Sequence, residues 1–378
     1  MKICMLLSTP FPPKEGIGYH TYYLSKKLIE KGHKVVVITR GSWRKTQKEI
    51  FEGIEVIRVP FIPLYPFYMK LHGFFVNKTF KSIESEIDIL HYQTPLPPLI
   101  KTSKPTIITI HTPMLTDNKY YTRIRSLYSF LSKISARFVS YPLELKLIRS
   151  ANIVTTVSSS VANELIEYNM KPENVIVIGN GVDEKSFKAK AKKSENSSKY
   201  VLFAGRIDRE KGLFDLIECG KYIFEGKSDI DFIIAGKGRD LNKLKRKTKK
   251  MGIQDKYKFL GQVDKDELVK LYQNASIFVL PSYHEGLPGV LLEAMACSMP
   301  IIASDVRGNR DLISNDFNGI IVPPRDPKKL AKAILKLTKD KKLGYKYGKN
   351  ARKTIEEKYT WNRISYKILK CYKSLVEA

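Results

Sequence analysis

Short apolar runs alternate with amphipathic helical patterns along most of the chain. An apolar run at residues 3–7 leads into a Pro/Gly-rich loop, a helical pattern at residues 20–31 and a second apolar run at residues 35–39. Apolar runs of this length predict buried strands, and strands that alternate with helices predict parallel pairing with right-handed crossovers. The pattern therefore predicts an α/β fold with doubly wound parallel sheets.

The chain has 378 residues, which is too long for one compact domain, and the alternation restarts near its middle. Residues 185–199 are rich in lysine, serine and alanine, and lack large apolar side chains after Phe187, as a linker would. We expect a first domain at residues 1–185, a second at 186–358 and a helical segment at 359–378. Further strands are expected at residues 54–59, 87–92, 106–110, 153–157, 175–178, 200–204, 231–235, 258–260, 277–280, 301–303 and 319–322.

Residues 276–304 carry the most specific pattern in the chain. They read as strand, loop, helix and strand, with Glu285 in the loop and Glu293 inside the helix. A loop that leads from a strand into a helix presents unpaired backbone N–H groups and the positive end of the helix dipole, which suit an anionic ligand. Carboxylates at that place could accept hydrogen bonds from sugar or ribose hydroxyls. The alternative is two solvated surface glutamates, although Glu293 lies among apolar helix residues.

The sequence SYHEGLPGVLLEAMACSMPIIASDV at residues 282–306 resembles the donor-binding signature of retaining glycosyltransferases of family 4. The resemblance extends along nearly the whole chain and implies two Rossmann-like domains in the GT-B arrangement, with the C-terminal helix crossing back to the first domain. It also implies that a nucleotide-diphospho-sugar, such as a UDP- or GDP-sugar, binds mainly to the second domain and the acceptor to the first.

Three further motifs agree with this resemblance. Arg206 and Lys211 bracket the loop FAGRIDREKG, where they could hold a diphosphate and neutralise the leaving nucleotide, or could be ordinary surface charges. His111 ends the strand in ITIHTP and could hydrogen-bond the donor sugar, or could be a structural buried histidine. Gly16 in PPKEGIGYH would let a backbone N–H approach a phosphate, although the usual pair of glycines reads Glu15-Gly16 here.

The resemblance thus implies one set of site residues divided by role. Its catalytic members are Glu285 and His111, which would contact the sugar, and Glu293 would bind the ribose. The full donor-binding set is Gly16, Arg206, Lys211, Gly286, Leu287, Val290 and Glu293. The remaining histidines are interpreted as structural; they are His20, His33, His72, His91 and His284.

No metal and no further cofactor is expected. Two D-x-D patterns, Asp229/Asp231 and Asp264/Asp266, could in principle hold a divalent ion, but each lies at an element boundary and is interpreted as a pair of solvated turn residues. Arg206 and Lys211 can already offset the charge of a diphosphate. The four cysteines are far apart with no C-x-x-C pair, which favours free thiols in a reducing compartment.

Lysine and arginine outnumber acidic residues by 66 to 38, a formal charge of +28 that favours anionic partners. Residues 61–81 and 119–149 interleave basic and aromatic side chains, which would suit an anionic membrane surface, single-stranded nucleic acid, or simply a solvated lysine-rich face. No signal peptide or membrane-spanning window is apparent. We therefore expect a cytoplasmic protein that contacts the inner face of the membrane peripherally, and no nucleic-acid partner, because no nucleic-acid-binding motif accompanies the charge.

The resemblance therefore implies a retaining hexosyltransferase, which would move a sugar from a nucleotide-diphospho-sugar to a membrane lipid or a growing glycan. Two alternatives stay open: a nucleotide-sugar epimerase of the same architecture, and a basic nucleic-acid-binding protein. Isomerisation of the donor without acceptor would indicate the first, and strongly salt-dependent binding of oligonucleotides the second.

Overall fold

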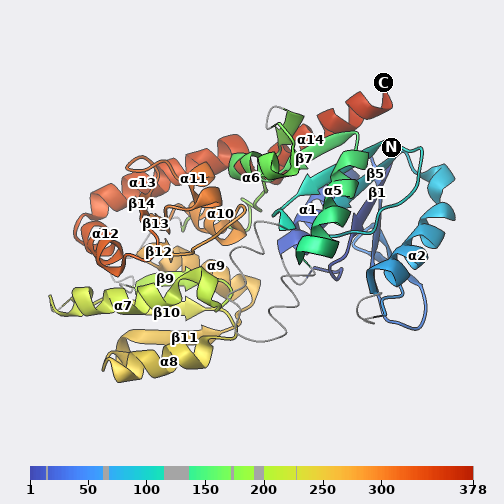
Figure 1. Cartoon of the computed structure of the whole chain (residues 1–378). Helices are drawn as coiled ribbons and strands as arrows, with labels where there is room; N and C mark the ends of the chain where they lie inside the picture. The colour runs from blue at the N-terminus through green and yellow to red at the C-terminus, as the bar shows by residue number, and fades with distance from the viewer. Residues whose placement is uncertain are drawn as a thin grey trace. The chain divides into compact units, whose positions relative to one another are not determined.

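The computed structural model describes residues 1–13, 16–62, 68–114, 136–171, 174–190, 200–226 and 228–377. The chain divides into two compact units, of which the first comprises Met1–Gly181 with Trp361–Ala378 and the second Val182–Thr360. Each unit contains one mainly parallel sheet with helices packed on it, which confirms the predicted fold class (Figure 1). The two units are described separately below.

The first unit is built on an eight-stranded sheet in the order β3-β4-β2-β1-β5-β6-β7-β8. All its strands pair in parallel except β3, which pairs antiparallel with β4. The strands are β1 (Lys2–Leu7), β2 (Lys34–Arg40), β3 (Gln47–Phe51), β4 (Ile54–Val59), β5 (Ile89–Gln93), β6 (Thr106–Ile110), β7 (Ile153–Thr156) and β8 (Val175–Val177). The helices are α1 (Gly16–Glu30), α2 (Tyr68–Lys81), α5 (Tyr141–Ser150), α6 (Ser159–Glu164) and α14 (Trp361–Val376), with shorter turns at Glu84–Glu86, Ala136–Ser140 and Leu165–Tyr168.

The second unit is built on a six-stranded, fully parallel sheet in the order β11-β10-β9-β12-β13-β14. The strands are β9 (Tyr200–Ala204), β10 (Asp231–Ala235), β11 (Tyr257–Gly261), β12 (Ile277–Leu280), β13 (Ile301–Ser304) and β14 (Ile320–Val322). The helices are α7 (Leu213–Phe224), α8 (Leu241–Lys250), α9 (Lys265–Asn274), α10 (Gly289–Ala296), α11 (Arg307–Leu312), α12 (Pro327–Lys339) and α13 (Lys341–Thr354), with turns at Arg209–Lys211, Gln254–Lys256 and Ile355–Tyr359.

The predicted strands are found within a few residues of their expected positions because they are buried on both faces. Every residue of β5, β6, β9, β12 and β13 is buried, and β9, β12 and β13 read as nearly continuous apolar runs, whereas β5 and β6 also bury polar side chains such as His91 and Gln93. Strand β3 was not predicted. Its sequence QKEIF is polar and exposed, and its main support is backbone pairing with β4 at the sheet edge.

The first helix shows how local sequence sets an element boundary. Leu24 and Leu28 on α1 are buried, and the helix ends at Glu30, two residues before Gly32, whose φ is +82°. The N–H of Gly32 donates to the carbonyl of Ile29 (2.9 Å) and that of His33 to the carbonyl of Leu28 (3.0 Å). This is the hydrogen-bond pattern of a Schellman cap, which a glycine allows at a left-handed position.

Helix α14 returns to the first unit, as the resemblance implied. Its buried face includes Ile364, Ile368 and Tyr372, which join the same apolar cluster as Ile3 and Met5 of β1. Where the chain leaves this unit, a Cβ on Gly181 would lie 2.3 Å from the indole of Trp361. Only glycine therefore fits beside the first residue of α14.

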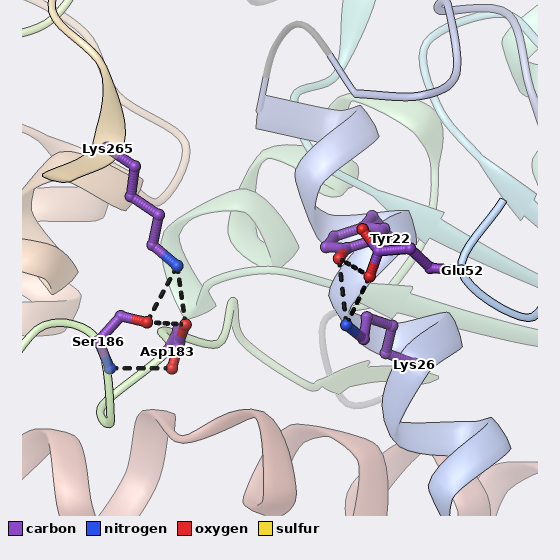
Figure 2. A network of polar contacts seen from close by, with 6 residues as sticks. All are labelled: Tyr22, Lys26, Glu52, Asp183, Ser186 and Lys265. Atoms are coloured by element: carbon purple, nitrogen blue, oxygen red, sulfur yellow. Dashed lines mark hydrogen bonds and ion pairs between the residues drawn. The ribbon is translucent and has the colours of Figure 1, made fainter.

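The unit boundary lies between Gly181 and Val182, whereas the sequence placed it near residue 185. Asp183 and Ser186 are bound to the second unit by Lys265, whose Nζ lies 2.9 Å from Asp183 Oδ2 and 3.0 Å from Ser186 Oγ (Figure 2). The guanidinium of Arg352 also donates to the carbonyls of Glu184 and Phe187. These contacts hold residues 183–187 on the second unit.

Some predicted segments lie partly outside the described residues. Residues 191–199 of the expected linker are not described, nor are residues 63–67 and 119–135 of the two basic aromatic segments. Residues 115–123, which follow His111 and its neighbours in the family-like stretch HTPMLTDNKYYTR, are also outside.

Candidate functional site

In the second unit, Glu285 lies at the centre of a compact polar corner after β12. Its Oε1 accepts hydrogen bonds from Nζ of Lys211 (2.6 Å) and from Oγ of Ser282 (2.6 Å). Only 7% of Glu285 and 15% of the Lys211 side chain are exposed, so water screens this ion pair weakly. The structure therefore brings together two residues that the sequence predicted from separate motifs.

Two loops interlock to make this corner. The loop after β9 ends at Gly212, whose φ is +68° and where a Cβ would lie 1.8 Å from the carbonyl oxygen of Pro281. The loop after β12 is also bound to it through the N–H of Tyr283, which donates to the carbonyl of Glu210 (2.7 Å). Because a side chain at position 212 would force the loops apart, this glycine sets the position of Lys211 relative to Glu285.

The residues after Glu285 that were predicted to bind the donor lie in the turn before α10 and in its first turn. Leu287 is buried, and the carbonyl of Gly286 would lie 2.1 Å from a Cβ on Gly308, so α11 packs directly on this turn. The N-cap of α10 is Pro288, and a Cβ on Gly289 would meet no atom within 4 Å. Val290 follows in the first turn, where backbone N–H groups lack intrahelical partners. The helix start therefore combines a fixed turn with open space beside it.

Arg206 lies on the exposed side of the same loop as Lys211. Its side chain is 61% exposed, and its Nη1 lies 3.4 Å from Oδ2 of Asp208. Arg239 approaches the other oxygen of Asp208 at 3.6 Å. The buried carboxylate of Asp208 thus lies near two exposed guanidinium groups, at the carboxyl ends of β9 and β10. The ammonium of Lys211 on the same loop is bound by Glu285 instead.

Glu293 is half-buried on α10, where its Oε2 accepts a hydrogen bond from the hydroxyl of Tyr272 (3.0 Å). Burial raises the pKa of Glu293 to about 7, and the Tyr272 hydrogen bond opposes this effect only in part. Tyr272 also donates to the carbonyl of Val290. This glutamate can therefore gain or lose a proton near neutral pH when its surroundings change.

His111 and Gly16 belong to the first unit. His111 follows β6, is 9% exposed, and places its Nε2 3.0 Å from Oε1 of Gln93. Burial, followed by the neighbouring His20 and His91, lowers its pKa well below the ordinary value, so the imidazole is neutral. Gly16 is the first residue of α1 and has open space around it, whereas a Cβ on Gly18 would approach Pro13 at 3.1 Å.

Several residues of these two clusters were not predicted from sequence. His20 was interpreted as structural, yet its ring lies edge-on to His111 with centroids 4.7 Å apart, and burial lowers its pKa to about 4. Ser282 was visible only as a polar residue three positions before Glu285, and Gln93 as a polar residue at the end of a strand. Their roles depend on contacts between strands, which no local motif encodes.

The two D-x-D pairs have structural contacts. Asp229 and Asp231 lie 2.8 and 3.7 Å from Nζ of Lys256. Asp264 is the N-cap of α9 and accepts a hydrogen bond from the N–H of Glu267 (2.8 Å). Asp231 is the first residue of β10 and Asp266 lies in the first turn of α9, so both pairs lie at element boundaries as expected, but these two residues are not turn residues.

An exposed apolar patch lies on the first unit around the start of α5. Phe138, Val139 and Leu143 are 70%, 44% and 41% exposed. They are interspersed with exposed basic residues, namely Arg137, Lys146 and Arg149. Among the described helices, none is long and apolar enough to span a membrane.

Each of the two units matches a glycosyltransferase family model. Residues 183–354 match the family model described as glycosyl transferases group 1, and residues 14–186 match that of glycosyltransferase family 4. An uncharacterised glycosyltransferase of Methanocaldococcus jannaschii is 29% identical over 100% of this chain and 99% of its own.

Solved structures agree on the fold. Sucrose-phosphate synthase from Thermosynechococcus elongatus superposes with a TM-score of 0.83 at 21% identity, covering 99% of this chain and 98% of that one. Anabaena HepE, solved with UDP-glucose, superposes with a TM-score of 0.74 at 18% identity, covering 99% and 100%.

The raised pKa of the Glu293 carboxyl group predicts a pH-dependent stability. Its pKa of about 7 lies above the ordinary value of 4.5, so the folded state resists deprotonation and loses stability as the pH rises from about 4.5 to about 7. Glu293→Gln removes this titration. We expect the variant to gain stability over the wild type with rising pH, by on the order of 3 kcal/mol at pH 8.

Urea unfolding of the unliganded protein at several pH values measures this difference. Glu225→Gln, an exposed glutamate after α7, serves as the control and should show no such trend. A constant difference between Glu293→Gln and the wild type across the range would contradict the account.

Proposed function

The chain belongs to the group 1 glycosyltransferases, with a GT-B fold, and we propose that it transfers a sugar from a nucleotide-diphospho-sugar to an acceptor with retention of configuration. The observation that carries this proposal is the buried corner of Lys211, Ser282 and Glu285 beside the start of α10. It combines cationic, anionic and backbone groups at the carboxyl ends of parallel strands, where α/β folds bind nucleotides.

The proposed donor is a UDP- or GDP-sugar bound mainly by the second unit. HepE, which shares the fold, binds UDP-glucose, and this supports a uridine donor. Glu293 would accept hydrogen bonds from the ribose hydroxyls, while the backbone of Gly286, Leu287 and Val290 would face the phosphates near the start of α10. Ribose binding would favour the charged form of Glu293.

Arg206 and Lys211 would bind the diphosphate. The exposed guanidinium of Arg206 can turn from Asp208 to a phosphate, and the ammonium of Lys211 has three N–H donors, of which the structure engages one with Glu285. Gly16 of the first unit would offer its backbone N–H to the same donor. Because these groups can offset the diphosphate charge, we propose that transfer requires no metal ion and no other cofactor.

Glu285 and His111 would contact the transferred sugar. Because Lys211 and Ser282 both bind Oε1, the Glu285 carboxylate is held in place and its charge is partly neutralised, which makes it a weak nucleophile. It is better suited to accept hydrogen bonds from sugar hydroxyls and to stabilise positive charge on the ring. A glycosidase-type double displacement would instead need two carboxylates that flank the scissile bond.

Retention would then follow from a reaction on one face of the sugar. The bond between the anomeric carbon and the diphosphate breaks through an oxocarbenium-like transition state, and the acceptor oxygen bonds to the same face. The acceptor proton passes to the departing phosphate oxygen. The electron pair of the broken bond stays on the phosphate oxygen, and the nucleoside diphosphate leaves. Atoms and charges therefore balance without a protein nucleophile.

A nucleotide-sugar epimerase could use the same fold and the same donor. The two activities differ in one product, because an epimerase converts the donor to an isomer without acceptor. Incubation of the purified protein with donor alone, followed by separation of the sugar nucleotides, distinguishes them.

The proposed role of Glu285 predicts a separation of binding and transfer. Glu285→Gln keeps the shape and a hydrogen-bond acceptor but removes the charge that stabilises the transition state. We expect kcat to fall by roughly a hundredfold or more, while nucleotide affinity stays within about threefold.

Transfer is measured with radiolabelled donor, and affinity by calorimetry with the nucleoside diphosphate. The exposed Glu225→Gln should behave as the wild type in both assays. If Glu285→Gln loses nucleotide affinity and transfer to the same extent, its proposed role in the transfer step is wrong.

The acceptor is proposed to be a membrane lipid or a lipid-linked glycan, reached from an anionic membrane surface. The patch of Phe138, Val139 and Leu143, surrounded by basic side chains, supports this proposal because it offers apolar area and positive charge together. The protein would then act as a peripheral protein on the cytoplasmic face.

Loss of one aromatic side chain from this patch should weaken membrane binding. Phe138→Ser is expected to reduce sedimentation with phosphatidylglycerol-containing vesicles by roughly tenfold, because burial of a phenylalanine contributes about 1.5–3 kcal/mol. Phe317→Ser is the matched control, since Phe317 is a 51% exposed phenylalanine of the second unit. Equal sedimentation of both variants and the wild type would refute membrane contact through this patch.

A further inference from the structure

The loop after β10 lies against the loop that carries Arg206. Strands β9 and β10 are neighbours in the sheet, so their carboxyl ends lie side by side (Figure 1). The N–H of Ile207 donates to the carbonyl of Lys237 (2.9 Å), and the N–H of Asp240 donates to the carbonyl of Ile207 (3.1 Å). A Cβ on Gly238 would lie 2.3 Å from the carbonyl oxygen of Ile207, so the two backbones are in direct contact. The loop after β10 is therefore fixed relative to that of Arg206.

Asp208 holds the guanidinium of Arg239 beside that of Arg206. Asp208 is 7% exposed, and its two oxygens lie 3.4 Å from Nη1 of Arg206 and 3.6 Å from Nε of Arg239. Because one carboxylate contacts both side chains, both guanidinium groups can reach the same diphosphate. Asp208 contacts Arg239 at Nε, which leaves the four N–H groups of its two Nη atoms available. No other described residue forms an ion pair or hydrogen bond with this guanidinium.

The charges of the two loops favour an anionic ligand beside Arg239. The ammonium of Lys211 is already paired with the carboxylate of Glu285. The two guanidinium groups share the single carboxylate of Asp208, so one positive charge is in excess at this point. A diphosphate ester is a dianion and would offset this excess. The arginine pair therefore suits a phosphate group better than a neutral ligand.

The backbone of the loop after β10 offers further hydrogen-bond donors. No described residue accepts a hydrogen bond from the backbone N–H of Lys237, Gly238 or Arg239. These three residues are exposed, so a ligand can reach them. Successive backbone N–H groups in a fixed turn form a concave site for anions. The backbone and the side chain of Arg239 thus favour the same kind of ligand.

We propose that Arg239 binds the diphosphate of the donor together with Arg206, and that the backbone N–H groups of residues 237–239 complete this phosphate site. The inference rests on the proposed function, which places the donor diphosphate at the loop of Arg206. It deepens that function by adding a second guanidinium, held by Asp208, from the loop after β10. A planar guanidinium donates two parallel hydrogen bonds to two phosphate oxygens, which gives the contact a defined geometry.

Binding of a nucleoside diphosphate and of its nucleoside tests this contact without the transfer reaction. UDP and uridine serve as probes, or GDP and guanosine if the wild type binds GDP more tightly. We expect Arg239→Gln to weaken binding of the nucleoside diphosphate roughly tenfold, because charged hydrogen bonds to phosphate oxygens are lost. The affinity for the nucleoside should change by less than about twofold, since it has no phosphate. Calorimetry measures the first affinity, and an NMR titration the weaker second one.

Arg246→Gln is the matched control. Arg246 is an exposed arginine of α8, the helix that follows the loop, and its replacement lowers the net charge by the same amount. We expect this variant to keep both affinities within about twofold of the wild type, because exposed charges away from the ligand are screened by salt. The Arg239 side chain is 82% exposed, so neither variant should lower the thermal midpoint of the unliganded protein.

Arg206→Gln separates this inference from the proposed function. If Arg206→Gln weakens binding of the nucleoside diphosphate and Arg239→Gln does not, the diphosphate lies at the proposed loop but the inference about Arg239 is wrong. The inference is also wrong if Arg239→Gln weakens the nucleoside as much as the nucleoside diphosphate, or if Arg246→Gln has the same effect as Arg239→Gln. If neither Arg206→Gln nor Arg239→Gln changes the affinity for the nucleoside diphosphate, the proposed diphosphate site is wrong together with the inference.

Discussion

The geometry of the second unit depends on the close approach of two loop backbones. Gly212 meets the carbonyl of Pro281 at a distance that excludes any side chain, and this contact places Lys211 against Glu285. The pair is buried, so each charge needs the other, and loss of either partner would leave an uncompensated charge. A second glycine, Gly308, lets α11 pack on the turn that follows Glu285. The backbone at the start of α10, which we propose binds the diphosphate, is therefore fixed by close backbone contacts.

The first unit uses neutral polar groups instead of charges. Burial lowers the pKa of His20 to about 4 and that of His91 to about 3, and it keeps His111 neutral as well. Three uncharged imidazoles beside a buried amide form a hydrogen-bonding surface that does not change with pH in the neutral range. Such a surface suits recognition of sugar hydroxyls, whereas the cationic loop of the second unit suits phosphates.

Most of the fold could be predicted from sequence because most of the parallel strands are buried and rich in apolar residues. Strand β3 could not, since its polar residues are held by pairing with β4 and not by burial. Glu285 and Lys211 could be predicted because each lies in a local motif. The contacts of His20 and Gln93 could not, because they arise between α1, β5 and β6, which are separated in sequence and meet only in the folded sheet.

The central claim is that the corner beside α10 binds a nucleotide diphosphate. Thermal unfolding of the wild type and of Glu293→Ala with UDP, GDP and ADP in turn tests it most directly, because a ligand of the native state raises the midpoint by mass action. The account predicts that one uridine or guanosine nucleotide stabilises the wild type and that the variant responds less. Stabilisation by none of the three, or an equal response of both proteins, would contradict it.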